Sequence, residues 1–188
     1  GITLYHSPRT RSGRVKMLLD LLELPYTLAT LDVRAGEHRS PAYLGLNPMG
    51  TVPTLVHHGQ VILESIAQMM YVAELAPERG LAPAPGAPSR AAYLSLFALS
   101  AVTLEPWLMG GLRHPDDPER RERMQRALAL LARQIVGPYC LGDAFSALDV
   151  LTHWNVCAIG RLGAPVDDHP NLVAYRDRLL PTLDWTEY

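Results

Sequence analysis

The stretch Thr51-Val52-Pro53-Thr54-Leu55-Val56 carries the strongest indication of how the first half of the chain folds. Its last three residues are typical of a β-strand, yet Pro53, which has no N–H to donate to a sheet, stands where that strand begins. A cis Val52–Pro53 bond would explain this, because it turns the backbone N–H and C=O of Val52 outward, where an extended peptide can pair as an added strand. The alternative is a trans proline at a sheet edge, so the surrounding residues have to decide.

Apolar runs on both sides of this stretch alternate between strand and helix patterns. They predict a strand, a helix and a second strand, followed by two short strands and a final helix, at residues 2–5, 15–22, 26–31, 54–56, 61–63 and 65–75. Gly59 lies in the connection between the two short strands, as expected of a hairpin turn. The first half therefore starts as a β-α-β unit and ends with a hairpin and a helix.

The segment Ala82-Pro83-Ala84-Pro85-Gly86-Ala87-Pro88 separates two differently patterned halves. Its prolines are incompatible with a continuous helix or a central strand. Beyond it the pattern is helical, and helices are predicted at residues 89–112, 118–136, 146–162 and 171–180. We predict an α/β domain over residues 1–76, a linker over 77–87 and an all-helical domain over 88–188.

The composition favours a cytoplasmic protein that binds a small ligand. Hydrophobic residues make up 48% of the 188-residue chain, and the formal net charge of −2 provides no sustained basic field for nucleic acid or an anionic membrane. Two cysteines, Cys140 and Cys157, are too few for a secreted disulfide framework. The histidines lack the spacing of a metal site, so no metal is expected. Polar residues interrupt the most apolar stretch, 91–109, which predicts a buried helix rather than a membrane span.

Glu64 and Ser65 stand where the hairpin ends and the next helix is predicted to begin. The first N–H groups of a helix are free, and together with the Ser65 hydroxyl they can hold a carboxylate at the positive end of the helix dipole. Glu64 can bind an ammonium beside it. The pair suits a ligand with a free α-amino-acid head, although a serine here can also act only as a helix cap.

The segment between the first predicted strand and helix concentrates hydroxyl and guanidinium groups: Tyr5-His6-Ser7-Pro8-Arg9-Thr10-Arg11-Ser12-Gly13-Arg14. At a helix N-terminus such groups can stabilise a thiolate, which makes a thiol with a free pKa of about 8.5 a good nucleophile at neutral pH. The candidates are Tyr5, Thr10, Arg11 and Ser12. The alternative is structural: one of the hydroxyls caps the helix and the tyrosine packs in the core.

Four motifs together resemble a bacterial glutathione S-transferase. The first motif is Tyr5-His6-Ser7-Pro8-Arg9-Thr10-Arg11-Ser12, the turn after the first predicted strand, with Arg14-Val15. The other three are Leu46-Asn47-Pro48-Met49-Gly50-Thr51-Val52-Pro53-Thr54-Leu55, Leu63-Glu64-Ser65, and Leu141-Gly142-Asp143-Ala144-Phe145-Ser146-Ala147-Leu148-Asp149. Each is modest alone, but in this order and spacing they are specific and span nearly the whole chain. The resemblance implies a thioredoxin-like N-terminal domain followed by a C-terminal helical bundle. In the last motif, Ser146 and Asp149 also have the pattern of a capping box.

The resemblance implies glutathione as co-substrate and assigns six residues to its binding: Val52, Pro53, Glu64, Ser65, His38 and Arg39. The first two, with the proline cis, would pair with the cysteinyl backbone, and the next two would hold the γ-glutamyl head. The histidine matches a position that reaches the glycyl carboxylate in theta-like members, and the arginine beside it is a second candidate. The alternative for these last two is a solvated basic loop.

The chain departs from the family pattern at the catalytic residue. Cysteine-type members would carry Cys near Arg11, serine-type members carry Ser close to Thr10, and tyrosine-type members have a Tyr that matches Tyr5. We rank Thr10 first, then Ser12, Tyr5 and Arg11.

The co-substrate pocket is expected to include Trp107, Met109 and His114, on and after the helix that contains residues 105–109. The alternative is that such side chains belong to the core of the helical bundle. The last residues, 180–188, stand where family members commonly continue into a further helix. This difference leaves the class of co-substrate open.

These inferences predict a cytoplasmic, homodimeric glutathione transferase in which the thiolate of glutathione attacks a hydrophobic electrophile, as in detoxification. The resemblance implies that this dimer is symmetric and that the helices that begin at Ser65 and Ser89 supply much of its interface. Three alternatives remain: a glutathione-dependent isomerase of the zeta type, a glutathione-dependent peroxidase, and a non-catalytic interaction protein with the same fold. The zeta type carries Ser-Ser-Cys at the position where this chain reads Arg9-Thr10-Arg11.

Overall fold

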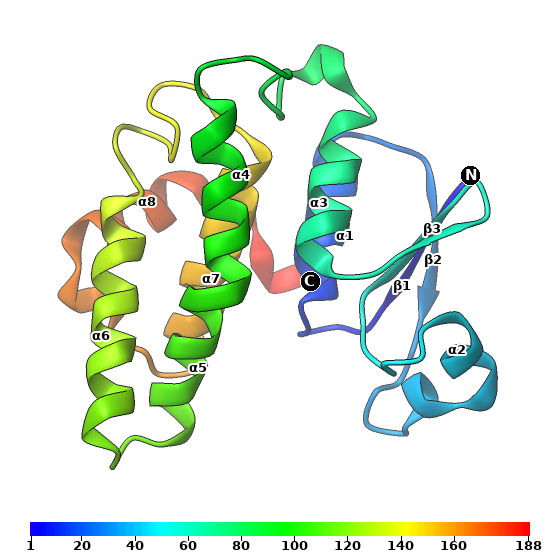
Figure 1. Ribbon diagram of the computed structural model, residues 1–188, viewed down its shortest axis with the longest axis horizontal. Helices are drawn as coiled ribbons and strands as arrows, with labels where there is room; N and C mark the ends of the chain where they lie inside the picture. Colours follow the sequence, from blue (N-terminus) through cyan, green and yellow to red (C-terminus); the bar gives the residue numbers. More distant parts are fainter. The chain divides into compact units, whose positions relative to one another are not determined.

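The computed structural model describes residues 1–188, apart from the side chain of Glu187. The chain forms two compact units (Figure 1). One contains Gly1–Arg79 together with Trp185–Tyr188, and the other contains Gly80–Asp184. The first unit is built on a sheet and the second on helices, which confirms the predicted class of α/β followed by all-α.

The sheet of the first unit has four strands in the order β2-β1-β3-β4. β1 (Ile2–His6) runs parallel to β2 (Tyr26–Thr30) and antiparallel to β3 (Thr54–His57), which pairs with β4 (Gln60–Ile62). Because β1 and β2 are parallel and β3 runs antiparallel to β1, the ends of β1 and β2 lie at the same edge of the sheet as the start of β3. The predicted glutathione-binding and catalytic segments follow or precede strands at this edge.

Helices cover both faces of the sheet. α1 (Ser12–Leu21) and α3 (Ser65–Glu74) lie on one face, and α2 (Pro41–Leu46) lies on the other (Figure 1). The Ser40 hydroxyl accepts the Tyr43 N–H and a proline occupies the first position of α2, a favourable helix start. Short 3₁₀ turns complete the unit: η1 (Glu37–Arg39), η2 (Pro77–Arg79) and η5 (Trp185–Glu187).

The second unit is a helical domain. Its elements are α4 (Arg90–Leu99), the π-helical turn η3 (Ser100–Leu104), α5 (Glu105–Arg113), α6 (Pro118–Arg133), α7 (Ala147–Arg161), η4 (Val166–Asp168) and α8 (Pro170–Leu179). Leu104, Leu128 and Leu172 belong to its buried core. The helix predicted over residues 89–112 is therefore continuous but changes to a π-helical turn in its middle, which the sequence pattern did not indicate.

The predicted capping box at the start of α7 is confirmed. The Ser146 hydroxyl accepts the Leu148 N–H at 3.2 Å, and the Asp149 carboxylate accepts the Ser146 N–H at 3.0 Å. The same carboxylate also accepts the Cys140 N–H and the Tyr175 O–H, each at 2.8 Å. The box thus fastens the loop before α7 and the helix α8 as well as the helix start.

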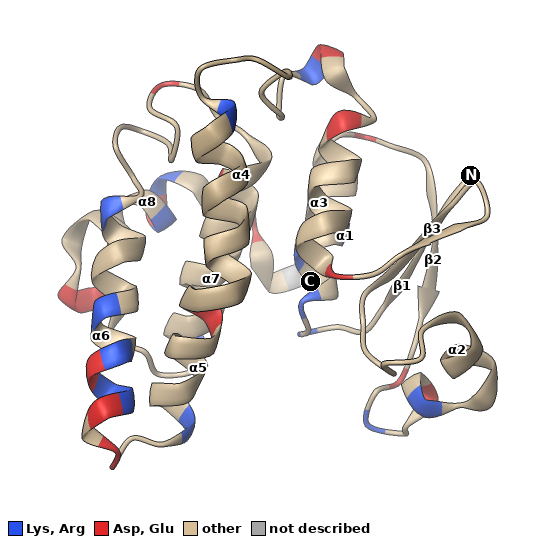
Figure 2. Cartoon of the chain, viewed as in Figure 1, with Lys and Arg blue, Asp and Glu red and all other residues tan. Residues whose placement is uncertain are grey.

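One described helix, Arg90–Arg113, is long and apolar enough to cross a membrane by length and composition, a test that core helices also pass. Only 33% of its most apolar window is buried, so the prediction of a buried helix is right for one side only. Leu94 is 40% exposed and Val102 75% exposed, whereas Glu105 is buried. Figure 2 shows charged residues along α6, while α4 is uncharged over nearly all of its length.

Candidate functional site

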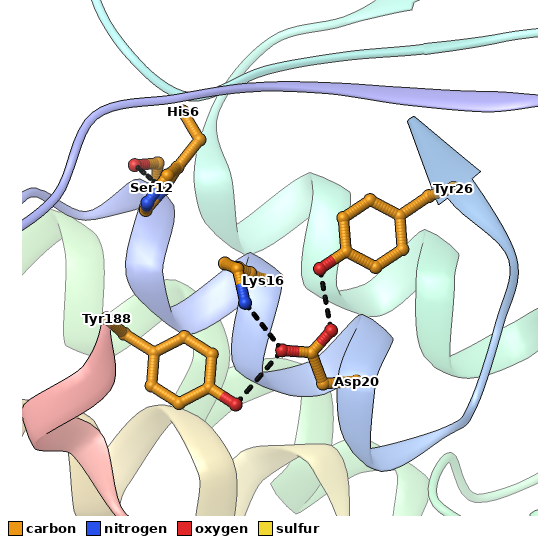
Figure 3. Close-up of polar contacts among 6 residues, drawn as sticks. All are labelled: His6, Ser12, Lys16, Asp20, Tyr26 and Tyr188. Atoms are coloured by element: carbon orange, nitrogen blue, oxygen red, sulfur yellow. Dashed lines mark hydrogen bonds and ion pairs between the residues drawn. The ribbon is translucent and has the colours of Figure 1, made fainter. Parts of the chain in front are cut away.

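The turn between β1 and α1 is held by a network of hydroxyl groups. The Ser12 Oγ lies 2.7 Å from His6 Nδ1 and 2.7 Å from Thr10 Oγ1. It also donates to the Ser7 carbonyl oxygen at 3.0 Å and accepts the Ser7 N–H at 3.1 Å. The Ser12 side chain is fully buried, and its contact with His6 is drawn in Figure 3. Ser12 therefore organises the turn from inside.

Thr10 is the outer member of this network. Its hydroxyl donates to the Ser7 carbonyl oxygen at 2.8 Å and lies 2.7 Å from Ser12 Oγ, and its side chain is partly exposed. A bound thiol can reach a partly exposed hydroxyl, whereas the buried Ser12 can act on it only through Thr10. The geometry favours Thr10 as the contacting residue and Ser12 as its support.

The other two candidates for the catalytic role lie outside this network. Tyr5 stands between the buried residues Leu4 and His6 on β1, so its side chain points to the opposite face of the sheet. There its ring centre lies 5.6 Å from that of Tyr43. Arg11 is exposed and directly precedes α1, where its charge lies near the helix start.

The start of α3 combines a buried cation, a hydroxyl and an exposed carboxylate. Arg14 of α1 is 1% exposed, and its Nε and Nη2 both donate to Ser65 Oγ, at 3.1 and 2.7 Å. Because the Ser65 oxygen accepts these two bonds, its own proton is left to donate. Glu64 is exposed and has φ 66°, a left-handed conformation that is strained in a non-glycine residue and is often found at functional sites.

The loop around Val52 is held in place by side chains of α2 and the residue after it. The Val52–Pro53 bond is cis, as the resemblance implies. The Tyr43 hydroxyl donates to the Thr51 carbonyl oxygen at 2.6 Å, and Asn47 Nδ2 donates to the same oxygen at 2.9 Å. The backbone that precedes β3 is thereby fixed.

Gln68 of α3 ties the other side of this loop. Its fully buried side chain donates from Nε2 to the carbonyl oxygens of Pro53, at 3.1 Å, and Ile62, at 2.8 Å. Gln68 lies about one helical turn after Ser65. The loop and the start of α3 are therefore parts of one connected structure.

Replacing Gln68 by methionine should destabilise the protein and weaken the predicted binding of glutathione at this edge of the sheet. The variant keeps the volume but leaves two carbonyl oxygens without the amide donor, which we expect to destabilise the protein by about 1–3 kcal/mol. If the loop is part of the binding site, glutathione affinity should also fall, by about 3- to 10-fold. Urea unfolding and calorimetric titration would measure both effects. Gln60→Met, at an exposed position of β4, is the matched control and should change neither.

His38 and Arg39 lie in η1, beside the same loop. A Cβ atom on Gly50 would stand 3.2 Å from the His38 carbonyl oxygen and 3.9 Å from Arg39 Cγ, so the backbone of η1 approaches the loop closely. Gly50 has φ 58°, which suits glycine. His38 Nδ1 is buried and has no hydrogen-bond partner among the described residues. Both predicted residues are therefore neighbours of the Val52 loop.

The three predicted pocket residues lie on or just after α5, in the second unit. Trp107 packs partly buried against the core of that unit, and the guanidinium carbons of Arg123 and Arg126 lie 5.9 and 5.4 Å from its ring centre. Met109 is partly buried and His114 is exposed. Their role as pocket residues stays a prediction.

The chain's own cysteines are poorly suited to nucleophilic chemistry. Cys140 and Cys157 are both buried, and burial raises the pKa of each thiol to about 12. A reactive cysteine instead needs exposure and a lowered pKa. Among the described residues, no group of three or more His, Cys, Asp or Glu is placed to hold a metal ion.

A cavity of about 580 Å³ opens beside Thr10. It lies between the β1–α1 turn and the loop after β2, at the edge of the sheet where the two parallel strands end. The residues that line it are Ser7, Pro8, Arg9, Thr10, Thr30, Leu31, Asp32, Val33 and Arg34. A reactant in this cavity would contact Thr10, the candidate hydrogen-bond donor to a thiolate.

Comparisons with known proteins agree with this geometry. Residues 1–74 match the family described as Glutathione S-transferase, N-terminal domain. The maleylacetoacetate isomerase of Pseudomonas aeruginosa is 31% identical in an alignment that covers 90% of this chain and 85% of that protein. The chain belongs to the glutathione S-transferase family.

Two further relatives of this glutathione S-transferase family member extend over most of its length. Maleylacetoacetate isomerase maiA of Aspergillus fumigatus is 28% identical, covering 95% of this chain and 85% of that protein. The crystal structure of a glutathione transferase homologue from Sulfitobacter, solved with bound glutathione, has a TM-score of 0.72 at 27% identity and covers 95% of this chain and 92% of that one. The thioredoxin-like sheet followed by a helical domain, which the resemblance implied, is confirmed.

Two buried polar residues near the Val52 loop and the start of α3, Arg14 and Gln68, were not predicted as site residues. Arg14 belongs to the first family motif and Gln68 to a predicted helix, and the sequence pattern gives neither a role in binding. Arginine and glutamine on a buried helix face are unusual, and that position is the only signal the sequence offers for them. Their partners become visible only once α1 and α3 pack together.

The C-terminal residues join the first unit through Asp20 of α1 (Figure 3). The Asp20 carboxylate accepts hydrogen bonds from Lys16 at 2.8 Å, Tyr26 at 2.6 Å and Tyr188 at 3.0 Å. Burial alone would raise the pKa of the Asp20 carboxyl, but these three bonds outweigh burial and lower it. The Lys16 ammonium also lies 4.6 Å from the centre of the Tyr188 ring. These contacts hold Tyr188 beside α1 and the turn between β1 and α1.

The stability of the protein should decline as the pH falls below 6.5, in part because of His6. Burial, followed by the charge of Lys16, lowers the pKa of His6 from 6.5. The neutral ring is therefore favoured by folding, and its contribution, present above pH 6.5, is lost as the pH falls through the lowered value. We expect His6→Asn to reduce this pH dependence in urea unfolding above and below pH 6.5. An identical pH dependence in both proteins would contradict the prediction, since the other histidines are common to them.

Proposed function

We propose that the chain is a glutathione transferase that joins the sulfur of glutathione to an electrophilic carbon. The observation that carries the proposal is the start of α3, where Arg14 donates twice to Ser65 and leaves the serine proton and the helix N–H groups to a ligand. This arrangement beside Glu64 suits a carboxylate next to an ammonium. The γ-glutamyl head of glutathione carries both groups on one carbon.

The rest of the tripeptide would follow the edge of the sheet. The backbone N–H and C=O of Val52 would pair with the cysteinyl residue, as an added strand does. Its thiol would then point toward the turn that follows β1. His38 and Arg39, which lie next to Gly50, would take the glycyl carboxylate.

Thr10 is proposed to stabilise the thiolate. At pH 7 a thiol with a pKa of about 8.5 is ionised only to a few per cent. The Thr10 hydroxyl, which donates to the Ser7 carbonyl oxygen in the structure, would turn its proton toward the sulfur, and this hydrogen bond and the positive end of α1 near Arg11 would lower the thiol pKa. Each unit by which the thiol pKa falls corresponds to about 1.4 kcal/mol of thiolate stabilisation. The sulfur would attack the electrophile, forming a C–S bond while the leaving group departs with its bonding electrons.

A second candidate is a glutathione-dependent cis–trans isomerisation. Two related proteins favour this candidate: those from P. aeruginosa and A. fumigatus are both named maleylacetoacetate isomerase. In such a reaction the thiolate would add to a double bond, allow rotation and leave again. The first turn reads Arg9-Thr10-Arg11 in place of the Ser-Ser-Cys of the zeta type, so we place this candidate second.

We further propose that the protein acts in the cytoplasm as a homodimer. The exposed apolar residues Leu94 of α4 and Val102 of η3 support an interface there, together with α3. A two-fold contact would use the same patch on both subunits. The oligomeric state can be measured by sedimentation, and Val102→Glu should shift it toward the monomer.

Calorimetric titration with glutathione, together with the ultraviolet absorbance of bound thiolate, tests the proposed function. We expect binding in the micromolar to millimolar range and thiolate at neutral pH, followed by conjugation of an aryl chloride. Isomerisation of a maleyl compound without net conjugation would favour the second candidate. No binding of glutathione would overturn both and favour a non-catalytic protein with this fold.

A further inference from the structure

Two arginines from different loops line the cavity beside Thr10. Arg9 belongs to the turn after β1, and Arg34 belongs to the loop after β2. The rest of the lining is partly apolar, with Pro8, Leu31 and Val33. An entirely apolar reactant requires no charged groups in the wall of its pocket, whereas this wall contains two cations.

Neither guanidinium contributes a polar contact to the described part of the fold. Within the part of the chain that the structure describes, the Arg9 and Arg34 side chains form no hydrogen bond and no ion pair. Exposed arginines elsewhere do pair, as Arg79 does with Glu23. The two cavity arginines therefore remain available to a ligand.

The backbone at both arginines is held in place. Arg9 has φ 62°, and its N–H donates to the Tyr188 carbonyl oxygen at 3.3 Å. The Arg34 N–H donates to the Asp32 carboxylate at 2.9 Å, and the Ala35 N–H donates to the same oxygen at 3.0 Å. Asp32 is the one acidic residue in the cavity lining, and these N–H bonds partly satisfy its charge. The lining thus carries two cations against one anion.

We infer that this cavity is a subsite for a carboxylate group carried by the co-substrate, with Arg9 and Arg34 as its binding residues. The inference rests on the proposed transferase function, because Thr10 links the cavity to the thiolate. Guanidinium groups bind carboxylates through paired N–H donors, and the apolar lining would contact the body of the reactant. The substrate class becomes an acidic electrophile with an apolar body, instead of the wholly hydrophobic one expected from the sequence.

The test compares two electrophiles that differ by one charge. Chlorodinitrobenzene is neutral, and chlorodinitrobenzoate is the corresponding aryl chloride with a carboxylate. In both reactions the glutathione sulfur bonds to the ring carbon, the C–Cl bond breaks and chloride leaves with the electron pair. The measured quantity is kcat/KM for each electrophile, together with the KM for glutathione.

The variants are Arg9→Asn, Arg34→Gln and the double variant. Asparagine tolerates the left-handed conformation of residue 9 better than alanine does. Arg133→Ala, at an exposed position of α6 outside the cavity, is the control for loss of one positive charge. We expect the double variant to lose about 10-fold in kcat/KM for the benzoate, with the neutral chloride and the glutathione KM unchanged.

Each other outcome overturns the inference in a distinguishable way. Equal losses for both electrophiles with a raised glutathione KM would mean that the arginines hold the glycyl carboxylate of glutathione. Unchanged kinetics in an active enzyme would remove the subsite but leave the proposed function intact. No conjugation of either electrophile by the unmodified protein would overturn the proposed function, and the subsite with it.

Discussion

Thr10→Val is expected to lower kcat/KM for conjugation about 100-fold, the largest effect we predict. The substitution removes one hydroxyl donor and keeps the shape of the side chain. Loss of a single donor to a developing or bound anion in an enclosed site commonly lowers the rate by about 10²- to 10³-fold. Stopped-flow or steady-state assays with an aryl chloride would measure it, and the bound thiol should titrate at higher pH.

The pH profile separates a catalytic role of Thr10 from a structural one. If Thr10 stabilises the thiolate, the variant regains activity as the pH rises, and Thr10→Ser retains most of the activity at neutral pH. Thr27→Val, at an exposed position of β2, is the matched control. Unchanged activity in Thr10→Val would transfer the role to Arg11 or to the N-terminus of α1, because Ser12 is buried and Tyr5 lies on the other face of the sheet.

Ser65→Ala is expected to weaken glutathione binding about 10- to 100-fold. The hydroxyl would donate to the carboxylate of the γ-glutamyl head, and hydrogen bonds to a charged group are worth about 1.5–3 kcal/mol. The variant also deprives the buried Arg14 of the acceptor of two N–H bonds. We therefore expect a lower free energy of unfolding as well, measured by urea denaturation beside the calorimetric titration.

A double-mutant cycle with Arg14→Met distinguishes the two consequences of Ser65→Ala. If Arg14 acts through Ser65, the two substitutions should be clearly non-additive in glutathione affinity. Ser89→Ala is the matched control, since Ser89 precedes α4 and forms no side-chain capping bond. Full affinity in folded Ser65→Ala would contradict the assignment of the head group to α3.

Local patterns predicted one feature of each unit. Proline at position 53 and the family motifs pointed to a cis bond, and Ser146 with Asp149 pointed to a capping box; both are present. These features depend on residues a few positions apart. The difference between Thr10 and Ser12 did not follow from the sequence, because both are hydroxyl residues of one turn and only the packed turn decides which is buried.

The sequence by itself determined the order of the four strands and of the helices apart from the short α2, for which no range is predicted, together with the division into an α/β and a helical half and the positions of the motifs. These depend on periodicity, proline, glycine and capping within short segments. Only the tertiary structure decided that Arg14 bonds to Ser65, 51 residues away, and that Arg9 and Arg34 share one cavity. Such contacts arise when strand pairing and helix packing bring distant segments together, and no local pattern records which distant side chains will meet.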